Sequence, residues 1–350
     1  MSRAERLDAL TQLSRERILV LDGAMGTQIQ GFDLKGEDFS GDKFPDWPIP
    51  LKGNNDLLNL TRPDIIKSIH VRFIEAGADL IETNTFSATT IAQTDYALEA
   101  HAAEIALEGA KLARQAADEM SAKLGRTIGV LGAFGPTNKT LSLSPNVNDP
   151  GYRDVDFDTV CAAYIEQARA MAPYVDFFLI ETVFDTLNAK AAIKAVLDFR
   201  METAEDIPMI ISGTITDASG RTLSGQTAEA FWISVRHAKP WAVGLNCALG
   251  ADMMRPHIAS ISRLADTRII AYPNAGLPNA FGEYDETPDQ MAVQIAEWAQ
   301  SGFLNIVGGC CGTTPEHIHA LAKAVKEKPG RDVPRATSSM QLSGLEPLIV

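Results

Sequence analysis

Short apolar segments recur along the whole chain, and each is rich in Ile, Val, Leu and Phe. They span residues 18–24, 78–86, 127–135, 175–182, 208–215, 242–249, 268–276 and 303–312. Nearly continuous apolar runs of this length are typical of strands that are buried on both faces. Patterns with helical spacing lie between them, at 63–77, 159–172, 227–238, 289–302 and 315–328. This alternation predicts right-handed βα units and a parallel sheet.

Eight strands, each followed by a helix, fit an α/β fold of the (β/α)8 TIM-barrel type. A doubly wound open sheet is the alternative parallel architecture. Residues 32–56 form a long polar loop after the first strand. In a barrel this loop lies on the active face, although it is equally compatible with a simple surface excursion. We expect one barrel domain over residues 1–328, and a linker over 329–350 that leads towards a following module absent from this chain.

Composition narrows the classes of function. The chain has 350 residues, with 31 basic against 45 acidic side chains and a formal net charge of −14. Such a balance argues against a nucleic-acid partner, which requires clustered Lys and Arg. The charged N-terminus and the lack of a run of about 18 apolar residues predict neither a signal peptide nor a membrane span. With four cysteines and no export signal, we expect a reducing cytoplasm.

Three of those cysteines fall where predicted strands end, and side chains at these ends converge on one mouth of a barrel. The polar residues collected there are Asp22, Glu82, Thr83, Asn84, Glu181, Thr214, Asn246, Cys247, Asn274, Cys310 and Cys311. Three converging thiolates match a catalytic zinc, which has three protein ligands and one open position. The adjacent pair of cysteines requires a sharp turn, and Gly308, Gly309 and Gly312 are expected to allow it.

Other interpretations of the cysteines remain open. The adjacent pair could simply fill a glycine-rich strand end, or form a strained ring disulfide or a redox pair. Cys161 lies in a helical pattern and is expected to be a small buried apolar residue.

Asp22 and Glu181 could be an acid–base pair, a cation-binding pair or groups that cap loops. No lysine lies at a strand end, which argues against a Schiff-base enzyme.

Several motifs resemble the homocysteine S-methyltransferase family. They are "LDGAMGTQIQ", "GNNDLLNLTRPDII", "ETNTF", "LIETVFDTLNAK", "GLNCALG", "PNAGLPNAFGEYD" and "GGCCGTTPEHI". The resemblance runs from about residue 15 to residue 328, and it is strongest to the N-terminal homocysteine-binding module of cobalamin-dependent methionine synthases. The final "LSGLEPLIV" resembles the linker into the next module of those enzymes.

The resemblance implies a (β/α)8 barrel in which Cys247, Cys310 and Cys311 hold zinc and the sulfur of homocysteine takes the open position. It also implies that Asp22 and Glu181 bind the substrate ammonium. The backbone N–H groups of Gly23, Ala24 and Met25 then hold the substrate carboxylate. A free thiol has a pKa of about 8.5 and is mostly protonated at neutral pH. Zinc binds the thiolate, which is the reactive form, so the thiol of homocysteine releases its proton when it binds the metal.

The resemblance further implies that the methyl donor is methylcobalamin, carried by another module. Folate-, cobalamin- and reactivation-type modules of the same full-length protein would then be the partners. This chain lacks a cobalamin-binding "DxHxxG" pattern and a second barrel for folate. A stand-alone enzyme using S-methylmethionine or betaine is the alternative, and a zinc-binding or thiol redox-sensing barrel without catalysis is a different class. Without substrate, either water or Asn274, which lies between the two cysteine-bearing strands, would complete the zinc site.

Overall fold

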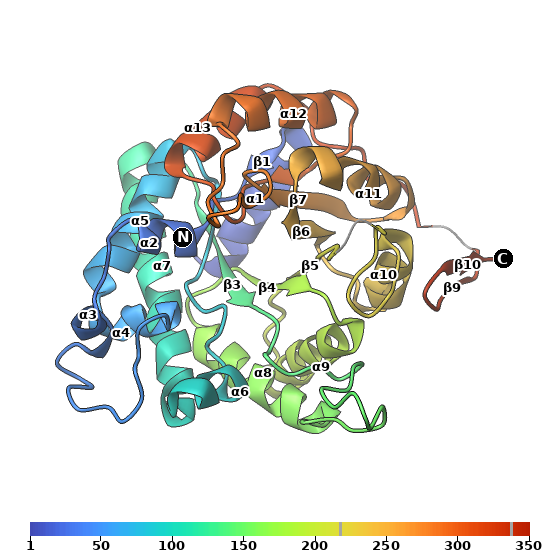
Figure 1. Ribbon diagram of the computed structural model, residues 1–350. Helices are drawn as coiled ribbons and strands as arrows, with labels where there is room; N and C mark the ends of the chain where they lie inside the picture. The colour runs from blue at the N-terminus through green and yellow to red at the C-terminus, as the bar shows by residue number, and fades with distance from the viewer. Residues whose placement is uncertain (217–218, 337–338) are drawn as a thin grey trace.

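The computed structural model describes residues 1–216, 219–336 and 339–350. Within these ranges, eight parallel strands form one sheet in the order β1-β8-β7-β6-β5-β4-β3-β2 (Figure 1). The strands are β1 (Leu19–Val20), β2 (Leu80–Glu82), β3 (Gly129–Phe134), β4 (Phe177–Val183), β5 (Met209–Gly213), β6 (Ala242–Gly250), β7 (Arg268–Asn274) and β8 (Ile306–Val307). A parallel bridge between Leu21 and Leu80 joins the two ends of the sheet. The predicted barrel is therefore confirmed, and the open doubly wound sheet is wrong.

Each strand is followed by a helix that crosses back over the outside of the barrel. These crossover helices are α5 (Pro63–Ala76), α7 (Ala102–Leu124), α8 (Phe157–Met171), α9 (Thr186–Thr203), α10 (Ala228–Val235), α11 (Ala251–Leu264), α12 (Pro288–Gln300) and α13 (Pro315–Val325). Shorter helices precede α5 and α7, namely α2 (Met25–Gln30), α3 (Gly36–Ser40), α4 (Leu58–Thr61) and α6 (Thr90–Gln93). Among the described residues, no helix has both the length and the apolar character needed to cross a membrane.

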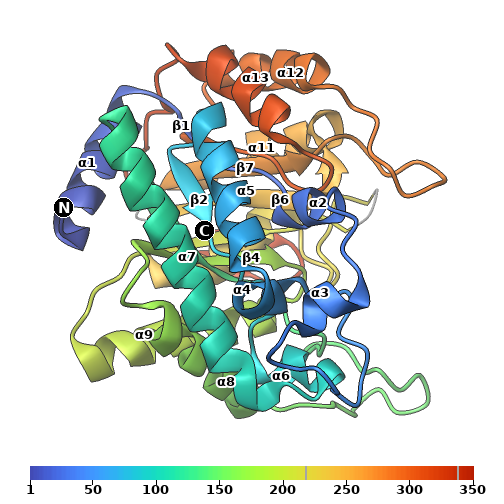
Figure 2. The same ribbon diagram turned by 90° about the vertical axis from the view of Figure 1, so that its left-hand side faces the viewer.

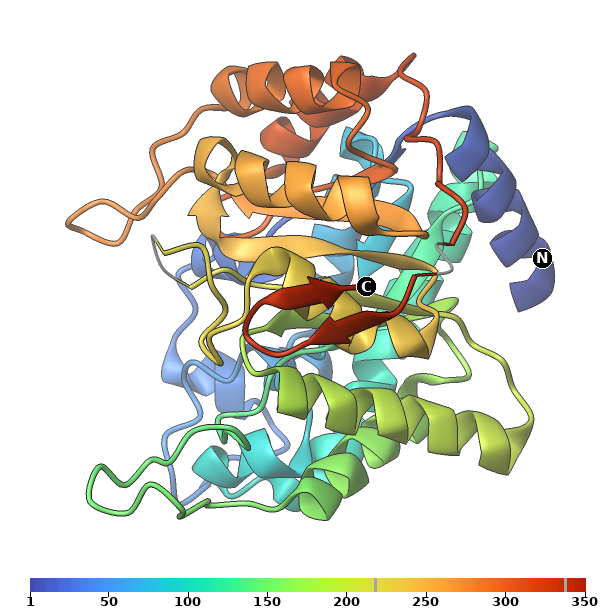
Figure 3. The same cartoon turned by 90° about the vertical axis from the view of Figure 1, so that its right-hand side faces the viewer.

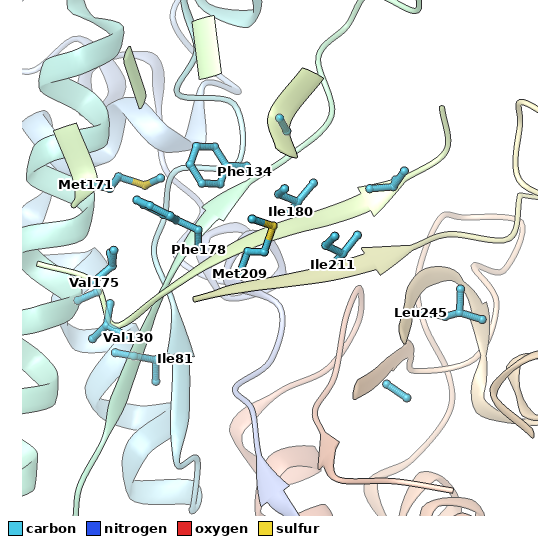
Figure 4. Close-up of a cluster of buried hydrophobic side chains, with 14 of the residues drawn as sticks. Ile81, Val130, Phe134, Met171, Val175, Phe178, Ile180, Met209, Ile211 and Leu245 are labelled. Carbon is cyan, nitrogen blue, oxygen red and sulfur yellow. The ribbon is translucent and has the colours of Figure 1, made fainter. Parts of the chain in front are cut away.

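Alternate residues of the strands belong to two separate apolar clusters. Along β4, Phe177 and Leu179 belong to the cluster inside the barrel, whereas Phe178 and Ile180 pack outwards against the helices (Figure 4). Both clusters are almost completely buried, which explains why the strands have nearly continuous apolar sequences. Glu181 continues the inward series and therefore lies at the upper end of the barrel interior.

Helix α1 (Arg3–Glu16) covers the N-terminal end of the barrel (Figure 2). Leu10 is fully buried in the interior cluster, and Arg6 pairs with Asp176 at 2.8 Å. Because this end is covered, access to the interior is from the opposite end, where the strands finish.

The loop over residues 32–56 is an ordered segment beside that opposite end. Phe39, Phe44 and Leu51 anchor it in the outer apolar cluster. Its last residues, Gly53 to Asp56, line the central cavity. The loop therefore belongs to the active face and is not a simple surface excursion.

The segment after residue 328 was predicted to be a linker, and part of it folds. Strands β9 (Gln341–Ser343) and β10 (Pro347–Ile349) form an antiparallel hairpin that lies against α10 (Figure 3). The hydroxyl group of Ser343 donates to the carbonyl of Ala230 at 2.6 Å, and the N–H of Thr227 donates to the carbonyl of Leu345 at 3.1 Å. A connection to a further module stays a prediction.

Candidate metal and substrate site

A cavity of about 780 Å³ lies at the C-terminal ends of the strands. Its acidic lining residues are Asp22, Asp56, Glu82, Glu181 and Glu283, and its lining includes Cys247, Cys310 and Cys311. Among the described residues that line it, none is Lys, Arg or His. A largely buried space with acidic groups and no side-chain cation favours a ligand that brings positive charge.

The three cysteines predicted to hold metal lie together at one side of this cavity. The Sγ atoms of Cys247 and Cys311 are 3.9 Å apart, and those of Cys310 and Cys311 are 4.0 Å apart. Ligands about 2.3 Å from a tetrahedral zinc have sulfur atoms about 3.8 Å apart. All three Sγ atoms lie within 4.8 Å of one another. The cysteines therefore fit a three-thiolate metal site.

The same distances exclude the ring disulfide in this structure. All four cysteines are free, and a 4.0 Å separation is about twice an S–S bond length. Cys161 is buried in α8, outside the group that the other three form, and its Sγ donates to the carbonyl of Ala191 at 3.4 Å. It is a packing residue, as predicted.

A bulge at the end of β6 positions Cys247. The register with β7 shifts between Asn246 and Gly250, and Cys247 and Ala248 have positive φ angles of 59° and 58°. Non-glycine residues adopt this conformation at a cost, and such residues cluster at functional sites. The bulge turns the Cys247 side chain into the mouth, towards the turn that carries Cys310 and Cys311.

A tight turn positions the adjacent cysteines. The N–H and hydroxyl groups of Thr313 both donate to the carbonyl of Cys310, at 3.1 and 2.7 Å. Gly312 has a φ of +81°, and a Cβ there would lie 2.3 Å from the Cβ of Tyr284. The expectation that three glycines supply backbone freedom is corrected in part. Gly308 and Gly309 have ordinary φ angles and instead provide room, because a Cβ would meet Leu21 or Thr313 within 2.7 Å.

Hydrogen bonding within the cluster favours one thiolate. Hydrogen bonds from Cys247 and then Cys310 lower the pKa of the Cys311 thiol to about 3. Separate hydrogen bonds with Cys247 and then Cys311 raise the pKa of Cys310. The pKa of Cys247 is raised to about 11, so without metal one thiolate is stabilised by two protonated thiols, and a bound metal would displace their protons.

Asp22 and Glu181 line the same cavity as the cysteines. They are only 3% and 5% exposed. Burial raises the pKa of both carboxyl groups, and the charge of Glu181 adds to the rise at Asp22. The Oδ1 of Asp22 has no hydrogen-bond partner among the described residues, whereas the hydroxyl of Tyr272 lies 3.4 Å from Oε2 of Glu181. This arrangement suits a cation-binding pair better than groups that cap loops.

The backbone at Gly23, Ala24 and Met25 lies beside Asp22 at the start of α2. The N–H of Ala24 donates to the hydroxyl of Thr313 at 3.1 Å. Thr313 belongs to the turn of the adjacent cysteines, so this bond connects the two halves of the cavity.

Asn274 ends β7, continuing the inward series of Ile270 and Tyr272. It is 2% exposed, and its Oδ1 has no hydrogen-bond partner among the described residues. The residue does not line the cavity itself. An orphaned amide oxygen between the two cysteine-bearing strands is compatible with a metal ligand, and this role stays a prediction.

Two site features were not assigned from sequence. Asp56 closes the long loop and is buried, and this burial raises the pKa of its carboxyl to about 7. Tyr284 follows β7 and lies against the Cys311–Gly312 turn. Asp56 is the last residue of the motif "GNND", which ends the long loop on the active face, so its position could have indicated a role in the site. Nothing in the sequence placed Tyr284 beside the cysteines.

Comparison with known families decides the class of this barrel. Residues 19–325 match the family described as homocysteine S-methyltransferase. The chain belongs to this family. Its members are methyltransferases, and the three-cysteine cluster, the acidic cavity and the barrel are consistent with that membership.

Solved structures support the same fold. The oxidized form of the homocysteine methyltransferase MmuM from Escherichia coli has a TM-score of 0.70 and 21% identity, with 91% of this chain and 99% of that chain covered. Its metallated form has a TM-score of 0.69 and 22% identity, with 89% and 98% covered. A methyltransferase from Methanosarcina mazei has a TM-score of 0.51 and 12% identity, with 93% and 98% covered. At these identities, the structural similarity establishes the fold of this homocysteine S-methyltransferase family member. It does not identify the methyl donor.

Proposed function

We propose that this chain binds homocysteine at a zinc ion held by Cys247, Cys310 and Cys311 and presents its sulfur for methylation, which yields methionine. The observation that carries the proposal is the spacing of the three Sγ atoms, 3.9 and 4.0 Å between successive pairs, at the edge of an acidic cavity. Zinc bound there would supply an activated substrate thiolate at neutral pH. The existence of MmuM from Escherichia coli in a metallated form agrees with metal binding in a structural relative.

The rest of the cavity would orient the amino-acid part of the substrate. Asp22 and Glu181 would accept hydrogen bonds from the ammonium, whose positive charge would offset the burial that raises the pKa of both carboxyl groups. The N–H groups of Gly23, Ala24 and Met25 would hold the carboxylate at the start of α2, and that of Ala24 would exchange the hydroxyl of Thr313 for it. Holding both groups fixes the direction in which the sulfur faces the cavity.

Methyl transfer then forms a carbon–sulfur bond while the bond between the methyl group and the donor breaks, and its electron pair stays with the donor. We propose methylcobalamin from a cobalamin module as this donor, with folate- and reactivation-type modules as further partners. The support is the set of sequence motifs shared with the modular enzymes. The cavity volume of about 780 Å³ leaves space above homocysteine for a donor group.

A stand-alone enzyme with a small onium donor is the second candidate. One observation favours it: Asp56, Phe86 and Tyr96 line the same cavity as the cysteines. A buried carboxylate beside aromatic faces suits a sulfonium or quaternary ammonium group. A purely redox-sensing or zinc-storing barrel would leave Asp22 and Glu181 without a role.

For the fourth position in the absence of substrate, we propose Asn274 as the ligand, with water as the competing choice. A neutral amide oxygen is a weak donor to a zinc that already has three thiolates, so an incoming substrate thiolate would displace it. X-ray absorption of the zinc-loaded chain should change from three sulfurs and one light atom to four sulfurs when homocysteine is added. If Asn274→Ala changes neither the resting spectrum nor the affinity for homocysteine, water is the ligand.

The activity itself is tested by calorimetry and turnover on the purified chain. We expect zinc-dependent homocysteine binding, slow methylation with supplied methylcobalamin, and negligible turnover with S-methylmethionine or betaine. Fast turnover with either onium compound would select the stand-alone enzyme. Absence of homocysteine binding by the zinc-loaded chain would refute the proposed function and leave the non-catalytic zinc or redox barrel.

A further inference from the structure

The polar run that begins at the last residue of β2 contains one carboxylate oxygen that the fold does not use. The hydroxyl groups of Thr83 and Thr85 lie 2.6 Å apart, and that of Thr85 donates to the carbonyl of Ala133 at 2.8 Å. The Nδ2 of Asn84 donates to the carbonyl of Asn55 at 2.9 Å. By contrast, the Oε1 of Glu82 is buried and has no hydrogen-bond partner among the described residues.

Glu82 lies beside Asp22 at the cavity. Leu80 belongs to the interior cluster and Ile81 to the outer one, so Glu82 resumes the inward series of β2. Its backbone N–H donates to Oδ2 of Asp22 at 3.1 Å, which places the two residues side by side. The other oxygen of Asp22, Oδ1, is also buried without a partner among the described residues, and both residues line the cavity.

Acids that serve the fold of this barrel look different. Asp79, directly before β2, accepts hydrogen bonds from Arg17 at 2.8 Å and from the N–H of Val20 at 2.9 Å. Asp176, before β4, accepts from Arg114 at 2.9 Å and from the N–H of Val130 at 2.9 Å. Each structural acid therefore has a cation and a backbone donor. Within the described part of the chain, Oε1 of Glu82 has neither.

No positively charged side chain among the described lining residues offsets the negative charge of Glu82 and its acidic neighbours. Burial raises the pKa of Glu82, and the nearby Asp22 carboxylate raises it further. The charge of Glu82 in turn raises the pKa of Glu181, so the three acids form one group. Since no described Lys, Arg or His lines the cavity, a cation from the ligand is the remaining partner.

We infer that Glu82 is a third acidic contact for the substrate ammonium, beside Asp22 and Glu181, and that the three acids select thiol substrates with a primary amine. An –NH₃⁺ group has three N–H donors. Three carboxyl groups that line one cavity offer an acceptor for each of them, whereas N-methylation removes a donor and loss of the amine removes all three. The inference rests on the proposed function, because it assumes that an amino-acid thiol occupies the cavity.

Calorimetry on the zinc-loaded chain with three thiols tests this role. The ligands are homocysteine, N-methylhomocysteine and 4-mercaptobutanoic acid, which lacks the amine. We expect Glu82→Gln to weaken homocysteine binding roughly 10- to 100-fold, as for a lost charge-assisted hydrogen bond. Its affinity for 4-mercaptobutanoic acid should stay within about twofold of the unmodified chain. Zinc content should not change, because Glu82 is not among the grouped metal-binding side chains.

Glu166→Gln is the matched control. Glu166 undergoes the same change of charge, but it is exposed on α8 and does not line the cavity. It should therefore leave the affinity for all three ligands nearly unchanged. The unmodified chain supplies a further measurement that needs no variant: N-methylhomocysteine should bind at least about tenfold more weakly than homocysteine.

The outcomes separate the two proposals. If the unmodified zinc-loaded chain binds no homocysteine, the proposed function itself fails. If it binds homocysteine but Glu82→Gln binds it equally well, or loses both homocysteine and 4-mercaptobutanoic acid to the same extent, only the role of Glu82 is overturned. Should Glu82→Gln not fold, equal binding of homocysteine and N-methylhomocysteine by the unmodified chain would overturn it instead.

Discussion

The side-chain amide of Asn246 forms two hydrogen bonds with Thr182, one with its backbone and one with its side chain. Its Oδ1 accepts from the N–H of Thr182 at 3.0 Å, and its Nδ2 donates to the hydroxyl of Thr182 at 2.8 Å. Thr182 has a positive φ of 54° and directly follows Glu181, while Asn246 directly precedes Cys247. One buried side chain therefore connects the bulge of β4 that carries Glu181, the proposed ammonium-binding acid, with the bulge of β6 that carries Cys247, a proposed metal ligand.

We predict that Asn246→Ala destabilises the protein and weakens both sites together. The substitution leaves the N–H of Thr182 and the hydroxyl of Ser212, which donates to Oδ1 at 2.6 Å, without their acceptor. Each buried group without its partner costs about 1–3 kcal/mol, so the free energy of unfolding should fall by about 2–6 kcal/mol in a urea titration. Thr214→Val is the control, since the buried hydroxyl of Thr214 has no partner among the described residues. An equal loss in both variants would contradict the role of Asn246.

The zinc site is tested by single cysteine substitutions. Elemental analysis should find one zinc per chain, and Cys247→Ala, Cys310→Ala or Cys311→Ala should each remove most of it. Their Sγ atoms form the only grouped set of candidate metal ligands in the described part of the chain. Cys161→Ala should keep the metal, because Cys161 is buried in α8. Full zinc content in Cys310→Ala would contradict the three-cysteine site.

Glu181→Gln tests the polarity of substrate binding. The amide keeps the size of the side chain and removes the charge that attracts an ammonium, which is worth about 1.5–3 kcal/mol. Calorimetry should therefore show homocysteine binding weakened roughly tenfold or more, with zinc still present. Glu166→Gln, at an exposed position on α8, makes the same change of charge away from the mouth and should have no effect. Unchanged affinity in Glu181→Gln would exclude its contact with the ammonium.

Asp56 makes the stability of the ligand-free protein depend on pH. Burial raises the pKa of its carboxyl from 3.8 to about 7, against the opposing hydrogen bond from the N–H of Ser87. Between about pH 4 and pH 7, the folded protein holds a proton that the unfolded chain has released, so this group makes stability fall as pH rises through that range. The loss is about 1.4 kcal/mol for each pH unit.

Asp56→Asn should therefore gain stability over the unmodified protein as pH rises from 4 to 7, and the difference should level off above pH 7. Urea titrations at several pH values measure this difference. Asp46→Asn, at an exposed position in the same loop, is the control and should show a constant difference. Parallel stability curves for the Asp56→Asn variant and the unmodified protein would show that Asp56 titrates normally.

The barrel, the grouping of the three cysteines and the family were all determined by the sequence. Strands that are buried on both faces require continuous apolar runs, so their number and order are visible in the residues themselves. In a barrel, all the strand ends lie at one mouth, so Cys247 and the Cys310–Cys311 pair could be brought together from the order of the strands alone. The acids Asp22 and Glu181 followed from the same rule together with the motifs around them.

Only the tertiary structure decided which strand-end residues are free to bind a ligand. Glu82, Thr83 and Asn84 are consecutive polar residues in one motif, yet the last two are used by the fold and Oε1 of Glu82 is not. The distinction depends on Asn55 and Asp22, which approach from other segments of the chain. A sequence shows that a side chain can form hydrogen bonds, whereas its partners and its burial depend on how distant segments pack, and these set its charge and its freedom to bind.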